Sequence, residues 1–174
     1  MPTTFYIDGY NVIYRSKDLR PLAERDFALA REALIDRVAA ICTAMGRRAV
    51  LVFDGRGRHL PERAHHDTGA SGLEVLYAPS NVTADAVIER FIYQATNKLD
   101  LVVVSGDRGL RDLCRNMGAL VIDADNFLQT SKEIDRDVRA QAARTRQASP
   151  SFLEEQLDPR SMAALAALRA KLEK

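Results

Sequence analysis

Several carboxylates stand where apolar segments of this sequence end. Asp8 follows TFYI, Asp54 follows AVLVF, Asp107 follows LDLVVVSG and Asp123 follows ALVI. In an open parallel sheet, ligands bind in the crevice outside the carboxyl ends of the strands, so acids at these positions predict a site. An Asp after a strand is also a common turn former or helix N-cap, and that interpretation stays open for each residue.

A further pair of acids lies in the segment TADAVIER. Asp85 and Glu89 are four residues apart and therefore share one face of a helix. This face borders the apolar stripe, so we expect both carboxylates where the helix meets the sheet. The alternatives are that Asp85 interacts only with the helix dipole and that Glu89 pairs with Arg90.

The acids predict chemistry that depends on hard divalent cations. Like charges in one crevice either raise their pKa values or hold cations, and Mg²⁺ and Mn²⁺ prefer oxygen ligands. Two such ions about 4 Å apart can activate water and stabilise the leaving oxygen in phosphodiester hydrolysis. Asn11, one helical turn beyond Asp8, would add a neutral ligand, position the water or serve as a cap.

Strands and helices that alternate along the chain would position these residues. The alternation predicts a mainly parallel sheet covered on both sides, an α/β fold. Thr83 is a candidate N-cap, and Gly46 and Gly118 are stop signals. The expected strands span 4–8, 49–54, 73–78, 99–107 and 119–123, and the expected helices span about 31–45, 83–95 and 108–117.

After residue 124 the pattern changes to mixed-charge, helix-prone sequence. We expect a helix over 126–147, a break at QASPS (147–151) and a last amphipathic helix over 159–174. This tail is interpreted as a solvated accessory helix. Packing on the domain, an extension of an RNA surface and exchange with a partner are the alternatives.

Composition limits the class of protein. Lys and Arg number 25 against 24 Asp and Glu, so any attraction to nucleic acid must come from local patches. Cys42 and Cys114 lie in apolar helical patterns, which favours buried free thiols over a disulfide or a metal site. Without a leader-like or membrane-spanning segment, we expect a cytoplasmic protein.

The motifs IDGYNVI, VFDGRG, TADAVIER and VVSGDRGL, in this order, carry a resemblance. Over roughly residues 3–130 the chain resembles the NYN domains of the PIN-like nuclease superfamily, in particular the bacterial YacP-like branch of small RNA-cleaving proteins. The resemblance implies a three-layer α/β/α sandwich over 1–128, with 129–174 as a helical C-terminal extension. It also implies a metal-dependent ribonuclease that uses Mg²⁺ or Mn²⁺.

The resemblance assigns roles to individual residues. Asp8, Asp85 and Asp107 match the acidic metal-binding positions of the family, and Asn11 matches its Asn. Some members of the superfamily bind RNA or scaffold proteins without cutting. The remaining matches are the accessory acids Asp54 and Glu89, and Ser105 of the S-x-D motif, whose hydroxyl can bond a carboxylate or phosphate.

RNA contacts are expected from a basic loop and from one aromatic residue. The loop over 55–72 is interpreted as contacting the RNA backbone, although a zinc site and a plain solvated loop are alternatives. It holds Arg56, Arg58, Arg63, His59, His65 and His66. Tyr10 would stack on an unpaired base or pack under the loop.

Further arginines would extend the RNA surface. These are Arg47, Arg48, Arg108 and Arg111, and Arg108 beside Asp107 is the expected phosphate contact.

We therefore expect a divalent-metal-dependent endoribonuclease that acts on single-stranded RNA. The alternatives are a non-catalytic RNA-binding or adaptor module and a phosphohydrolase of haloacid-dehalogenase type. The last needs a second Asp two residues after the first, where this chain has Tyr10. The sequence leaves open which RNA is bound, whether a ribosome or another partner presents it, and the oligomeric state.

Overall fold

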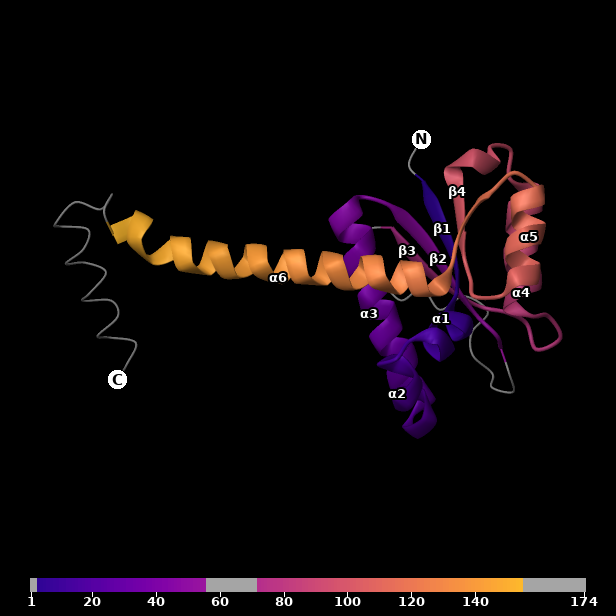
Figure 1. The fold of residues 1–174 in the computed structure, drawn as a ribbon, viewed down its shortest axis with the longest axis horizontal. Helices are drawn as coiled ribbons and strands as arrows, with labels where there is room; N and C mark the ends of the chain where they lie inside the picture. The colour runs from indigo at the N-terminus through magenta and orange to yellow at the C-terminus, as the bar shows by residue number, and fades with distance from the viewer. Residues whose placement is uncertain (1–2, 56–71, 155–174) are drawn as a thin grey trace. The chain divides into compact units, whose positions relative to one another are not determined.

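A five-stranded parallel sheet forms the centre of the structure, a computed structural model that describes residues 3–55 and 72–154. The strands lie in the order β3-β2-β1-β4-β5 (Figure 1). Their bounds are Thr4–Asp8 (β1), Arg48–Phe53 (β2), Leu73–Tyr77 (β3), Leu101–Val104 (β4) and Leu120–Ile122 (β5). The register aligns Thr4 with Arg48 and Ile7 with Val104.

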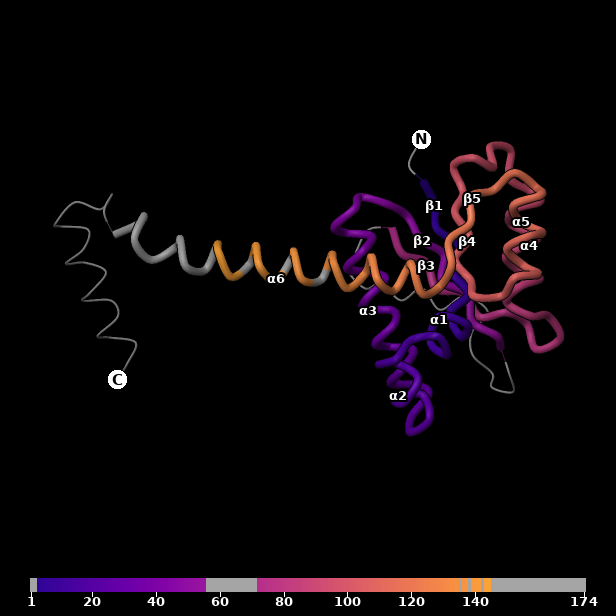
Figure 2. The backbone as a smooth tube through the Cα atoms, in the orientation of Figure 1, coloured from indigo at the N-terminus to yellow at the C-terminus, as the bar shows by residue number. Residues whose placement is uncertain are grey.

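Helices cover both faces of this sheet. They are α1 (Gly9–Arg15), α2 (Leu19–Arg25), α3 (Phe27–Met45), α4 (Ala84–Gln94), α5 (Arg108–Asn116) and α6 (Ala124–Glu154), with a 3₁₀ turn η1 (Lys98–Asp100). Figure 2 shows the backbone path through these elements. The predicted three-layer α/β/α fold with a parallel sheet is confirmed, together with a helix at the C-terminal side of the sheet domain.

Alternate residues of each strand supply the two layers of the core. Ile7, Leu51 and Phe53 belong to one buried cluster, which α1, α3 and the start of α6 complete. Val52 and Val103 belong to the other, which α4 and α5 complete. Successive strand residues point to opposite faces, so strands buried on both faces read as nearly continuous apolar runs.

The helix boundaries follow from the caps. Asp26 accepts hydrogen bonds from the Ala28 and Leu29 amides at the start of α3, and Gly46 ends this helix with a φ of 59°. Thr83 accepts from the Ala86 amide at the start of α4, which confirms the predicted N-cap.

Two expectations about secondary structure were wrong, and two short helices, Gly9–Arg15 and Leu19–Arg25, were not predicted because seven residues are too few for a clear helical period. Strand β4 is shorter than 99–107 because Leu99 and Asp100 belong to η1 and 105–107 form a turn. Helix α6 continues to Glu154 instead of breaking at 147–151, because a proline can remain inside a helix at the loss of one backbone hydrogen bond.

The chain divides into two compact units, Met1–Asp135 and Arg136–Lys174. Phe127 and Leu128 of α6 are buried in the core of the first unit. The boundary expected between residues 128 and 129 stays a prediction. Within the described residues, no helix is both long and apolar enough to cross a membrane.

Candidate active site

The candidate site lies where the strand order reverses. The chain continues from β1 to β2 and β3 on one side, and then crosses to β4 and β5 on the other side of β1. Asp8 ends β1, and Asp107 follows β4. Asn11 joins the two connections because its Oδ1 accepts a hydrogen bond from the Gly106 amide at 2.6 Å. This is the crevice in which open parallel sheets bind ligands.

Asp8 is both the last residue of β1 and the N-cap of α1. Its Oδ1 accepts from the Asn11 amide at 3.1 Å, and only 8% of the residue is exposed. The next residue must be small, because a Cβ on Gly9 would lie 2.3 Å from Cε1 of Phe53. Gly9 thus lets α1 begin against the core.

Asp8 and Asp85 form a pair of neighbouring carboxyl groups, and each affects the pKa of the other. Burial, followed by the nearby charges of Asp85 and Asp54, raises the pKa of Asp8 to about 7. Burial also raises the pKa of Asp85, and the charges of Asp107 and Asp54 add to this shift. The Oδ1 atom of Asp85 is buried and has no hydrogen-bond partner.

Asp54 and Asp107 complete the group, and each also caps a helix. Asp54 Oδ1 accepts from the Ala84 amide at 2.6 Å, which ties the end of β2 to the start of α4 beside Asp85. Asp107 is exposed and accepts from the Leu110 amide at 3.1 Å at the start of α5. The structure thus places four of the predicted acids together, with Asp8 buried and Asp85 half-buried.

The donor set fits a hard divalent cation. It offers carboxylate oxygens only, one of them buried without a partner, in a place where negative charge is crowded. Among residues 3–55 and 72–154, no three His, Cys, Asp or Glu side chains lie close enough to hold a metal by themselves. The fit is therefore to an ion such as Mg²⁺, which takes one or two protein carboxylates and keeps waters or phosphate oxygens in the rest of its shell.

Two of the acids singled out in the sequence, Glu89 and Asp123, do not belong to this cluster. Glu89 is exposed, contrary to the expected place at the sheet, and its charge acts on Cys114, whose pKa burial raises to about 11. Asp123 forms an ion pair with Arg111. The Asp125 amide and Arg111 hold the pKa of Asp123 below its usual value. The charges of Asp123 and Arg111 neutralise each other, so neither residue is part of the acid cluster.

Ser105 and Arg108 flank Asp107. Ser105 is fully buried, and its Oγ accepts from the Asp107 amide at 3.0 Å. The hydroxyl therefore shapes the turn that carries Asp107, and its burial leaves no room for the phosphate of an RNA, one of the two partners that the motif suggested for this hydroxyl. Arg108 is exposed at the first residue of α5, so its expected phosphate contact stays a prediction.

Other expected RNA contacts fall elsewhere. Arg48 begins β2 opposite Thr4, and Arg47 donates to the Thr3 hydroxyl. Both arginines therefore lie at the amino-terminal ends of the strands, whereas Asp8 lies at the carboxyl end of β1, contrary to expectation. Residues Arg56, Arg58, Arg63, His59, His65 and His66 lie outside the described residues. Tyr10 packs between Phe27 and Phe53 at centroid distances of 5.3 and 5.2 Å. The loop under which it was alternatively expected to pack lies mostly outside the described residues.

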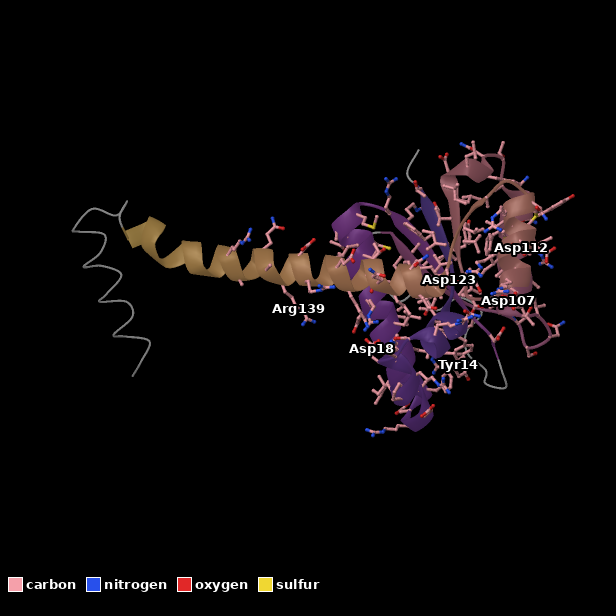
Figure 3. All side chains as sticks on the ribbon, in the orientation of Figure 1. Tyr14, Asp18, Asp107, Asp112, Asp123 and Arg139 are labelled. Carbon is pink, nitrogen blue, oxygen red and sulfur yellow. The ribbon has the colours of Figure 1, made fainter. Side chains whose placement is uncertain are left out.

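The sequence interpretation missed Arg15 and Tyr14. Arg15 donates to the Gly106 carbonyl at 3.4 Å and lies 3.7 Å from a carboxylate oxygen of Asp125. Tyr14 is exposed on α1, and Figure 3 shows it at the same end of the sheet as Asp107. The four-residue spacing of Tyr10 and Tyr14 would have identified this surface if α1 had been predicted as a helix.

Known proteins share this architecture. The profile of the YacP-like NYN domain matches residues 5–170. The uncharacterized protein YacP of Bacillus subtilis is 28% identical over 147 residues, which cover 83% of this chain and 84% of that protein. The crystal structure of Rae1 (YacP) from Bacillus subtilis has a TM-score of 0.70 at 25% identity and covers 98% of this chain and 92% of its own. The crystal structure of a mutant of the same Bacillus protein has a TM-score of 0.68 at 27% identity and covers 89% of both chains.

Proposed function

This chain belongs to the YacP-like NYN domain family, a PIN-like nuclease branch, and from this premise we propose that it is a divalent-metal-dependent endoribonuclease. The resemblance seen in the sequence motifs is thereby confirmed, and it supports a nuclease-type role. The proposed reaction is hydrolysis of phosphodiester bonds in single-stranded RNA.

The Asp8–Asp85 pair is the observation that supports this proposal most strongly. Two carboxyl groups with raised pKa values, one of them with an orphaned buried oxygen, repel each other until a proton or a cation lies between them. A structural role alone gives no reason to place these two carboxyl groups side by side at the switch point of the sheet.

Asp8 and Asp85 would hold Mg²⁺ or Mn²⁺, and exposed Asp107 would contribute through a water molecule. A bound cation would supply the charge that activates water and stabilises the leaving oxygen. Asp54 fixes the first turn of α4 and thereby positions Asp85.

Asn11 would orient the substrate. Its Oδ1 is held by the Gly106 amide, and no described residue accepts from its Nδ2 amide. Nδ2 is therefore available to donate to a phosphate oxygen or to the attacking water. Arg108, at the exposed start of α5, would bind a neighbouring phosphate.

The test uses the full chain and an end-labelled single-stranded RNA. We expect endonucleolytic products with Mg²⁺ or Mn²⁺, none with EDTA, and losses of at least about a hundredfold in Asp8→Asn and Asp85→Asn. Both substitutions keep the size of the side chain, and Asn is as good an N-cap as Asp. Asp36→Asn is the matched control, because Asp36 is exposed on α3.

The outcomes separate the candidates. Equal cutting by wild type, Asp8→Asn and Asp85→Asn, or cutting in EDTA, would reject this active site. RNA that is retained but stays intact with Mn²⁺ would instead identify a non-catalytic RNA-binding module.

A further inference from the structure

A pocket of about 510 Å³ opens beside the acid cluster. Its walls include Tyr10, Tyr14, Phe27, Arg25, Arg31 and Asp54. Asp54 belongs to both places, since its charge also raises the pKa values of Asp8 and Asp85. The volume lies within the range of small-molecule sites. Whatever occupies this pocket therefore lies next to the proposed point of cleavage.

The aromatic side chains of the pocket differ in how firmly they are held. Tyr10 is fixed between Phe27 and Phe53, and its hydroxyl accepts a hydrogen bond from Arg31 at 3.3 Å. Tyr14 meets Phe27 edge-on at a centroid distance of 5.9 Å, yet 56% of the residue is exposed. Tyr14 thus offers an accessible ring that is supported from one side.

The charged residues of the pocket wall are two arginines, Arg25 and Arg31, and two aspartates, Asp26 and Asp54. Each aspartate already accepts a hydrogen bond from an amide at a helix start, Asp26 at α3 and Asp54 at α4. Arg25 is exposed at the end of α2, and Arg31 is half-buried on α3. Guanidinium groups carry several N–H donors and no acceptor, and they also stack on flat aromatic groups. A flat ring with acceptor atoms on its edge, attached to a phosphate, matches this lining. A nucleotide has this chemistry, whereas a plain apolar ligand would offer neither arginine an acceptor.

We propose that this pocket binds the base of a nucleotide that flanks the scissile phosphate. The base would lie against Tyr14, with Arg31 and Arg25 directed to its acceptor atoms or to the adjoining phosphate. This inference rests on the proposed function, because it takes RNA to be the substrate. It goes beyond that function by assigning base recognition to α1, α2 and the start of α3.

The first experiment measures binding without cleavage. The four nucleoside 5′-monophosphates and ribose 5-phosphate are titrated into the full chain in EDTA, and binding is followed by NMR chemical shifts. Because base–aromatic stacking is a strong, sequence-tolerant interaction, we expect Tyr14→Ala to weaken nucleotide binding at least about fivefold and Tyr14→Phe to preserve it. Tyr93→Ala is the matched control, since Tyr93 is 75% exposed on α4 and lies outside the pocket.

Ribose 5-phosphate separates base recognition from phosphate binding. It should bind the wild-type chain more weakly than the nucleotides do, and Tyr14→Ala should not change its affinity. Equal affinities for ribose 5-phosphate and the nucleotides would overturn the inference and leave a phosphate site.

The second experiment maps cleavage positions on a mixed-sequence RNA. Arg31 and Arg25 would select the base through its acceptor atoms, so the wild-type chain and Tyr93→Ala should prefer particular bases at one position beside the cut. Tyr14→Ala no longer holds the ring against which these arginines act, and it should lose this preference. If the wild-type chain cuts RNA while Tyr14→Ala matches Tyr93→Ala in nucleotide affinity and in cleavage pattern, the pocket inference fails and the nuclease stands. If nucleotide binding depends on Tyr14 but no RNA is cut with Mn²⁺, the pocket inference stands and the nuclease fails.

Discussion

Replacing Asp8 with Asn should stabilise the metal-free protein at alkaline pH while abolishing RNA cleavage. Asp8 is 8% exposed and faces Asp85, so its ionised form is unfavourable in the folded state. Asn carries no charge, preserves the N-cap of α1 and can donate to the orphaned Asp85 oxygen. The proposed function therefore requires a side chain that lowers stability.

The pKa of Asp8 sets the size of the effect. It rises from an ordinary value of 3.8 to about 7, a difference of about 3 pH units. Since each pH unit corresponds to about 1.4 kcal/mol, the upper limit is about 4 kcal/mol in the free energy of unfolding. For a chain of this size, that corresponds to roughly 10 °C in Tm.

The sign of the pH dependence follows from the raised pKa. Below about pH 4, Asp8 is protonated in both the folded and the unfolded chain, so wild type and Asp8→Asn should be equally stable. Between about pH 4 and 7 the unfolded chain releases the proton first, and the wild type loses stability relative to the variant. Above about pH 7 the difference is constant.

Urea unfolding followed by circular dichroism in EDTA measures this difference at pH 4.5 and pH 8. Asp36→Asn, an exposed carboxylate on α3, should show no comparable gain at pH 8. Asp8→Ala should gain about 1 kcal/mol less than Asp8→Asn, because it loses the N-cap. A variant Asp8→Asn that is less stable than the wild type at pH 8, or a difference that does not change with pH, would refute the reasoning.

Adding Mg²⁺ or Mn²⁺ extends the same experiment. An ion that binds only the folded state stabilises it by mass action, so the wild type at pH 8 should gain stability and the gap to Asp8→Asn should narrow. Equal stabilisation of both proteins would contradict a cation site at Asp8, and it would leave the argument about the pKa intact.

Three further predictions concern the surroundings of the site. A Cβ on Gly106 would lie 2.6 Å from Asn11 Oδ1, so Gly106→Ala should lower the free energy of unfolding by about 1–3 kcal/mol. Gly106→Ala and Asn11→Ala should both reduce RNA cleavage. Wild-type cleavage rates in both variants would show that the hydrogen bond between Asn11 and Gly106 is dispensable. Thr83→Ala should cost about 1 kcal/mol in urea unfolding, and Thr83→Ser should preserve the cap of α4. Cys114 is buried with a pKa raised to about 11, so mass spectrometry should find it unmodified by iodoacetamide at pH 8 in the native chain and modified in urea, whereas rapid native alkylation would contradict its burial.

Long apolar runs and strong caps made most of the sheet predictable from the sequence. The segments around Ile7, Leu51 and Val103 are buried on both faces, and such strands carry their own signal. The helices over 9–25 were missed because each is only seven residues long, too short for a clear helical period. The strand order, and hence the switch point beside β1, depends on which strands pair and is not readable from local sequence.

The acids of the site were predictable from their places after strands, but their states were not. Asp8 and Asp123 each follow a strand, yet one faces Asp85 and the other pairs with Arg111. Asp85 and Glu89 are separated by one helical turn, and this spacing does not reveal that only Asp85 interacts with Asp8. These differences arise from contacts between elements that are distant in sequence.

The capping and the metal-binding interpretations of the acids do not exclude each other. Asp8 accepts from the first turn of α1, Asp107 from that of α5, and Asp54 from the first amide of α4. Helix N-termini favour negative charge, so this arrangement lets the fold gather carboxylates in one crevice. The helix N-termini offset the repulsion among these carboxylates only in part, because the pKa of Asp8 still rises to about 7. The remaining unfavourable charge is what a bound cation would relieve, and it is the quantity that the pH dependence of Asp8→Asn measures.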